Sequence, residues 1–131
     1  MIDRGTGSHG ERIDIRIQSQ YLVQQSQPEV NKYVFAYTIR IQNNGDTNCQ
    51  LITRHWVITE SDFSVQEVHG EGVVGKQPII EPGKCFEYTS AAVLKTEVGT
   101  MKGFYDLVSE SGRIFKAPIP QFTLSVPRVL Q

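Results

Sequence analysis

The sequence predicts an all-β protein, folded as one antiparallel β-sandwich of about eight strands. Apolar and polar residues alternate over several short segments, which is typical of strands with one buried face. Turn-forming residues recur about every 8–12 residues, the spacing expected of a sandwich. No segment shows a convincing helical pattern. The predicted strands, in chain order, are residues 13–23, 32–43, 49–61, 64–68, 85–90, 101–110, 114–120 and 122–126.

The first three predicted strands are the most regular. Ile13, Ile15 and Ile17 alternate in the first, and five apolar side chains alternate in the second. The sequence NNGD at residues 43–46 then predicts a turn, because Asn, Asp and Gly tolerate positive φ. The third strand contains the only tryptophan, Trp56, which we expect in the core.

The later strands are shorter and are separated by clear turn signals. The sequence EPGK at residues 81–84 predicts a turn, because Pro presets φ and Gly accepts positive φ. The sequence SESGR at residues 109–113 predicts a hairpin into the seventh strand. Pro127 is expected to end the last strand.

Length and composition indicate one domain. The chain has 131 residues, of which we expect residues 1–12 to form a flexible polar lead-in and residues 13–131 to form a single domain. The net charge of −1 argues against non-specific binding to nucleic acid. No apolar run approaches the ~20 residues that span a membrane, and no secretory signal is evident, so a cytoplasmic location is expected. In that compartment, Cys49 and Cys85 are predicted to be buried free thiols.

The glycines of residues 70–75 have the spacing G-x-G-x-x-G, with Gly70, Gly72 and Gly75 as its members. A dinucleotide-binding loop of this spacing needs a helix after the glycines, whose N-terminus binds the pyrophosphate. Pro78 and Pro82 follow instead, and neither suits a helix interior. The sequence therefore predicts a bend between strands and excludes a dinucleotide-binding fold.

The same segment also departs from a magnesium-dependent phosphate loop. Gly70, Gly75 and Lys76 have the required spacing, but Gln77 replaces the hydroxyl residue that binds Mg²⁺. Two interpretations of this segment remain. The glycines permit close turns between strands, or their N–H groups and Lys76 bind a small anion such as pyrophosphate or a nucleotide. Gly70, Gly72, Gly75 and Lys76 are the candidate site residues.

Five segments carry a resemblance to a known family: YVFAYTIRIQNNG, RHWVIT, EVHGEGVVGKQPIIEPG, EYTSAAVLKTEVGTMKGFYDLV and IPQFTLSVP. In this order and spacing the chain resembles the bacterial ApaG (CorD) family from about Ile13 to the C-terminus. The resemblance implies an immunoglobulin-like or fibronectin type III-like sandwich without an established enzymatic activity. It also implies links to magnesium and cobalt homeostasis and to diadenosine tetraphosphate metabolism, and a suggested pyrophosphate-binding role for the three glycines.

The remaining polar candidates are Arg54, His55 and His69. Arg54 and Trp56 share one face of a strand, so Arg54 is expected to pair with a carboxylate or with several carbonyls. The alternative is an edge position near a cleft, where Arg54 would bind a phosphate or carboxylate bidentately. His55 points to the other face and is expected near His69 across a hairpin. No third ligand is evident, so neither a metal site nor a cofactor is predicted.

The sequence thus favours a non-enzymatic binding or protein-interaction domain with an unknown protein partner. The alternatives are a small-anion binder at residues 70–76 and a protein of magnesium or cobalt homeostasis. The apolar AAVL segment at residues 91–94 and the C-terminal SVPRVLQ are candidate contact surfaces. The oligomeric state is not predicted.

Overall fold

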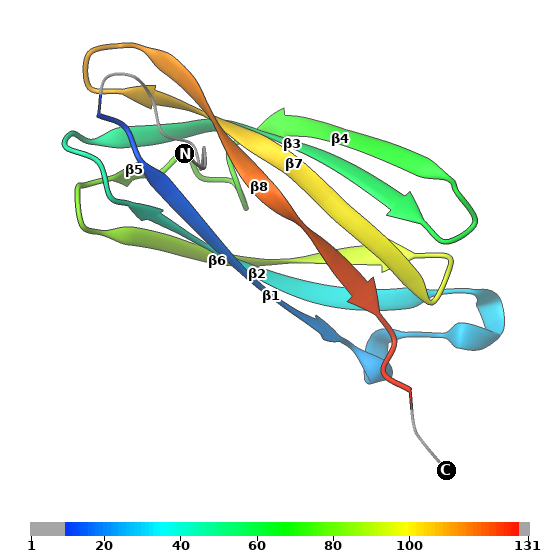
Figure 1. Cartoon of the computed structure of the whole chain (residues 1–131). Coiled ribbons are helices and arrows are strands. Elements are labelled where there is room, and N and C mark those ends of the chain that lie inside the picture. The colour runs from blue at the N-terminus through cyan, green and yellow to red at the C-terminus, as the bar shows by residue number, and fades with distance from the viewer. Residues whose placement is uncertain (1–9, 129–131) are drawn as a thin grey trace.

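The computed structural model describes residues 10–128 and contains two antiparallel sheets that pack face to face (Figure 1). The strands are β1 (Ile13–Tyr21), β2 (Tyr33–Asn43), β3 (Cys49–Glu60), β4 (Val65–Glu71), β5 (Ile79–Ile80), β6 (Cys85–Leu94), β7 (Val98–Ser109) and β8 (Ile114–Ser125). Two short 3₁₀ turns, η1 (Val23–Gln25) and η2 (Pro28–Val30), connect β1 to β2. The predicted antiparallel β-sandwich is confirmed.

The smaller sheet has the order β1-β2-β6, and the larger has β4-β3-β7-β8 with β5 also paired to β3. β4 and β5 lie along the same edge of β3, because β7 occupies its other edge. Gly70 lies near the end of β4, and Gly72 and Gly75 lie in the segment between β4 and β5, so the glycine motif lies where β3 changes its partner.

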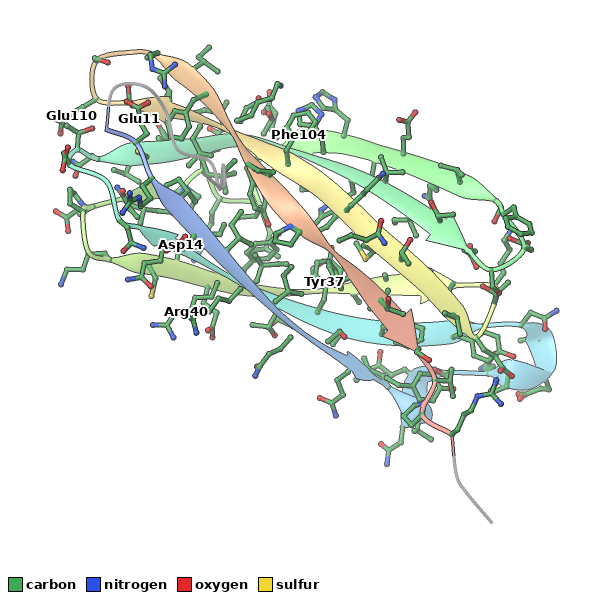
Figure 2. The ribbon with its side chains drawn as sticks, viewed as in Figure 1. Glu11, Asp14, Tyr37, Arg40, Phe104 and Glu110 are labelled. Carbon is green, nitrogen blue, oxygen red and sulfur yellow. The ribbon has the colours of Figure 1, made fainter. Side chains whose placement is uncertain are left out.

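The core lies between the sheets. Tyr37 from the smaller sheet contacts Trp56 and Phe122 from the larger, with ring centroids 5.6 and 6.1 Å away, and Figure 2 shows Tyr37 between the two layers. The hydroxyl groups of Tyr88 and Tyr105 lie 2.5 Å apart and join the two sheets. Burial raises the pKa of both hydroxyls, so they remain neutral. The expectation that Trp56 is a core residue is confirmed, since it is 3% exposed.

Several predicted strand ends shift by one to four residues, and two predicted strand assignments differ from the structure. The last two predicted strands form one strand, β8, whose pairing with β7 shifts register between Met101 and Gly103. Pro118 and Pro120 are accommodated because β8 lies at a sheet edge, where a missing N–H breaks no interstrand bond. The total of eight strands is still reached because residues 79–80, predicted as part of the loop after the glycines, form the additional short strand β5.

Packing also extends two residues before the predicted domain boundary. Glu11 is 3% exposed and forms an ion pair with Arg113. Residues 1–9 of the predicted lead-in, and the last three residues of the C-terminal segment, lie outside the described residues. Among residues 10–128, no helix is long and apolar enough to cross a membrane.

Candidate functional site

Gly70 belongs to strand β4 and lies against the side chain of Arg54. Gly70 pairs with Arg54 across the two strands, and a Cβ built on Gly70 would lie 2.8 Å from an Arg54 guanidinium nitrogen. Arg54 Nη1 donates hydrogen bonds to the carbonyls of Glu71 and Gly72, at 2.9 and 2.8 Å. The expected pairing of Arg54 with carbonyls is confirmed. The first glycine of the motif therefore makes room for an arginine that holds the end of β4.

Gly72 begins a tight turn that closes on itself. The N–H of Val73 donates to the carbonyl of Lys76 at 2.8 Å, and the N–H of Lys76 donates back at 2.9 Å. The central residues, Val74 and Gly75, both have positive φ, 42° and 78°, as in a type I′ turn. The side chain of Val73 is fully buried. The prediction of a bend without a following helix is confirmed.

Only some of the backbone N–H groups in this turn are free to bind a ligand. Gly72 donates to the carbonyl of Ile52, and Val73 and Lys76 donate to each other. Within residues 10–128, the N–H groups of Val74 and Gly75 have no hydrogen-bond acceptor, and the Lys76 side chain is exposed. The sequence-predicted residues therefore differ in position: Gly70 contacts Arg54, whereas Gly75 and Lys76 lie at the tip of the turn.

A second polar cluster lies on the outer face of the larger sheet. His55 stacks on Phe104 with centroids 4.2 Å apart and an interplanar angle of 17°, and His69 lies 4.3 Å from His55 on its other side. Lys116 Nζ lies 4.1 Å from the Phe104 ring centroid. Figure 2 shows Phe104 on the side of β7 that faces away from the smaller sheet. The expected proximity of His55 and His69 is confirmed.

Asp106 connects this cluster. Its Oδ2 accepts hydrogen bonds from Thr53 at 2.7 Å and from His55 Nε2 at 2.9 Å, and its Oδ1 accepts from Lys116 at 3.0 Å. Burial raises the pKa of Asp106, but hydrogen bonds from Thr53, Lys116 and His55 outweigh it, so the net pKa is lowered. The carboxylate is therefore charged at neutral pH. Asp106, Phe104 and Lys116 were missed by sequence reasoning, because only strand register brings them to His55.

The cluster has two imidazoles, whose planes are tilted by 40° to each other, and one carboxylate. Among residues 10–128, no three His, Cys, Asp or Glu side chains gather as ligands for a metal ion. The two cysteines are free, as predicted, but only Cys49 is buried, while Cys85 is exposed at the start of β6. Burial raises the pKa of Cys49 to about 11, with Glu11 adding to the shift.

Strand β6 is an edge strand with an exposed row of backbone groups. Among residues 10–128 its only sheet neighbour is β2, with continuous pairing from Gln42–Cys85 to Tyr33–Leu94. The N–H of Asn43 donates to the carbonyl of Lys84. Antiparallel hydrogen bonds alternate along a strand. Lys84 therefore faces β2, and alternate residues of β6 direct their N–H and C=O groups away from β2, toward the free edge. They are Cys85, Glu87, Thr89, Ala91 and Val93.

The other edges carry features that hinder pairing with a further strand. β8 contains Pro118, Pro120 and a register shift, and β1 packs against β8. β4 has only seven residues and ends at the Arg54-bound glycine segment. β6 has ten residues, no proline, lysine or bulge, and one charged side chain, Glu87. By the usual criteria, β6 is the least protected edge of the described chain.

Comparison with known proteins agrees with the family resemblance. The ApaG domain profile matches residues 23–109. Protein ApaG of Thiobacillus denitrificans is 56% identical over 119 residues, covering 91% of this chain and 94% of that protein. Protein ApaG of Ralstonia nicotianae is 52% identical over 118 residues, covering 90% and 95%. The crystal structure titled as the putative ApaA protein from Bordetella pertussis is 47% identical in sequence and superposes with a TM-score of 0.88. The superposition covers 92% of this chain and 98% of that one.

Proposed function

This chain belongs to the ApaG domain family, and we propose that it is a non-catalytic protein-binding module that pairs an extended segment of its partner with strand β6. The observation that carries the proposal is the free edge of β6, in which five residues direct outward backbone groups that have no partner within the described part of the chain. Strand addition satisfies such groups with the main chain of a peptide. The cytoplasm, where Cys49 and Cys85 would stay reduced, is the proposed location.

The side chains of β6 suit this mode of binding. Thr89, Ser90, Ala91 and Ala92 are small, so a partner strand meets little steric hindrance at the centre of the edge. On the outer face, Ala91 and Val93 are exposed and offer apolar contacts to alternate side chains of the added strand. The AAVL segment predicted as a contact surface is the C-terminal part of this edge.

The proposal is tested with a library of displayed extended peptides, selected on the immobilised full chain. Selected peptides should bind Ala91→Pro at least about tenfold more weakly, because proline removes an outward N–H and adds a ring at the edge. The β2–β6 bonds do not involve that N–H, so the fold should persist. Ala91→Thr retains the N–H and should bind like the wild type.

Hydrogen exchange provides the second readout. Peptide binding should slow exchange of the outward amides of Glu87, Thr89 and Ala91, while the exchange of the β7 amides stays unchanged. Peptides that bind Ala91→Pro as tightly as the wild type would contradict pairing at this edge.

A second candidate function is binding of pyrophosphate or a nucleotide phosphate at the turn of residues 72–76. It is favoured by the two N–H groups of Val74 and Gly75, which lack acceptors among the described residues, next to exposed Lys76. Pyrophosphate should raise the Tm of the wild type but not of Lys76→Ala. Lys32→Ala, which removes an exposed lysine outside the turn, is the matched control and should keep the shift. An equal shift in all three proteins would indicate non-specific binding.

A further inference from the structure

Phe63 combines two unfavourable features at the tip of the β3–β4 hairpin. Phe63 is 89% exposed, and its φ is +68°. Exposure forgoes the stabilisation that a buried phenyl ring supplies, and positive φ strains a bulky residue. Glycine or asparagine would close this kind of hairpin without that strain. The stability of the isolated chain therefore does not account for a phenylalanine here.

Hydrogen bonds inside the hairpin hold this conformation. The N–H of Glu60 donates to the carbonyl of Ser64, and the N–H of Phe63 donates to the carbonyl of Glu60, both at 2.9 Å. Asp62 Oδ1 accepts the N–H of Ser64 at 3.0 Å and its hydroxyl at 2.6 Å. The backbone that carries Phe63 is thus fixed on both sides.

The hairpin is also tied to the neighbouring β6–β7 turn. Glu60 Oε1 accepts the N–H groups of Lys95 at 2.6 Å and Thr96 at 3.0 Å. The N–H of Ser61 donates to the carbonyl of Val98 at 3.1 Å. These contacts fix the backbone that carries the exposed ring before any partner binds, which lowers the conformational entropy lost on binding.

Phe63 does not stand alone at this end of the sandwich. The β3–β4 hairpin, the β6–β7 turn and the β1–β2 connection reach the same end (Figure 1). Nine large apolar residues are exposed within residues 10–128, and six lie on these segments or at the strand ends that flank them. They are Val23, Val30, Phe63, Val65, Val93 and Val98.

The residue next to Phe63 carries a fixed negative charge. Asp62 is exposed, and hydrogen bonds from the Ser64 hydroxyl and N–H, with a smaller contribution from the nearby Lys95 charge, lower its pKa, so it is ionised near neutral pH. A partner surface that receives the phenyl ring would therefore gain from a cationic group beside its pocket.

We propose that this end of the sandwich is a protein-docking surface, anchored by Phe63, whose ring enters an apolar pocket of a folded partner with a lysine or arginine at the rim. A central aromatic side chain with a prearranged backbone is typical of the residues that dominate interface affinity. The inference rests on the proposed protein-binding function, but it does not depend on the β6 edge.

The first test separates the role of Phe63 from the stability of the fold. Phe63→Gly relieves the strained backbone, so its Tm should rise by about 2–5 °C. The matched control is Ile114→Thr, which removes an apolar side chain, 69% exposed, from another segment of the chain. A fall in the Tm of Phe63→Gly would contradict the strain on which the inference rests.

The partner is then captured in the source cells with the full chain carrying a photoreactive benzoylphenylalanine at residue 63 or, as control, at residue 114. We expect a discrete heterologous adduct from residue 63 alone, mapped to an apolar pocket with a neighbouring lysine or arginine. With this partner purified, Phe63→Gly should weaken the Kd by at least about 30-fold, and Ile114→Thr by less than about threefold.

The outcomes distinguish this inference from the proposed function. A partner that binds Phe63→Gly as the wild type, but not Ala91→Pro, would overturn the docking surface and leave strand addition intact. No adduct at residue 63, equal adducts at both residues, or an adduct between two copies of this chain would each overturn the inference.

Discussion

At the scale of single residues, the two glycines of the 72–76 turn have different tasks. A Cβ on Gly72, whose φ is +62°, would lie 2.3 Å from the carbonyl oxygen of Lys76, which is a backbone atom and cannot rotate away. Gly75 has a φ of +78°, but nothing lies within 4 Å of its Cβ direction. The motif is thus explained by close packing at its second glycine and by backbone conformation at its third.

This difference predicts unequal losses of stability. Gly72→Ala should lower the free energy of unfolding by about 2–4 kcal/mol, because a steric clash adds to the strained φ. Gly75→Ala should cost about 1 kcal/mol, and Gly75→Asn less, because only the backbone conformation is affected. Urea denaturation of the three variants measures these changes. Similar losses for Gly72→Ala and Gly75→Ala would contradict the assigned roles.

At the scale of the elements, Asp106 joins three strands. Its carboxylate on β7 accepts hydrogen bonds from Thr53 and His55 of β3 and from Lys116 of β8. Folding therefore favours the charged form, since the net pKa of Asp106 is lowered in the folded chain. The resulting stabilisation is present above the ordinary carboxyl pKa of about 3.9 and is lost as the pH falls through the lower folded-state value.

Asp106→Asn should therefore destabilise the chain in a pH-dependent way. At pH 7 we expect a loss of about 1–2 kcal/mol, reflecting weakened charge-assisted hydrogen bonds on a partly exposed group. The difference from the wild type should shrink as the pH falls below about 4, where the Asp106 carboxylate of the unfolded chain becomes protonated, and should disappear once that of the folded chain is protonated too. Urea denaturation at pH 7, 5 and 3 measures this. A difference that stays constant over that range would contradict the role of the charge.

At the scale of the whole molecule, the two sheets leave surfaces of different character. β6 offers backbone groups along an edge, whereas the end with Phe63 offers exposed apolar side chains on tied turns. Immunoglobulin-like sandwiches, the subclass that the family resemblance implies, bind partners through end loops, and sheet edges serve strand addition. The two surfaces meet near Val93 and Lys95, so one partner has access to both.

Much of the fold follows from local pattern. The alternation at Ile13, Ile15 and Ile17 and the turn residues at 43–46 predict strands and turns, because side-chain period and backbone preference are local properties. Two prolines after the glycine motif excluded a helix for the same reason. The merging of the last two predicted strands into β8 was not predicted, because only the position of β8 at an edge makes its prolines tolerable.

The sequence by itself determined the fold class, the family and the nature of the glycine segment as a bend. Tertiary structure alone decided which distant residues meet: Arg54 with Gly70, His55 with Asp106 and Phe104, and Glu11 with Arg113. It also decided that β6 is a free edge and that Phe63 lies exposed in a strained turn. The physical reason is that strand order and register depend on contacts between segments far apart in the chain, which no local pattern specifies.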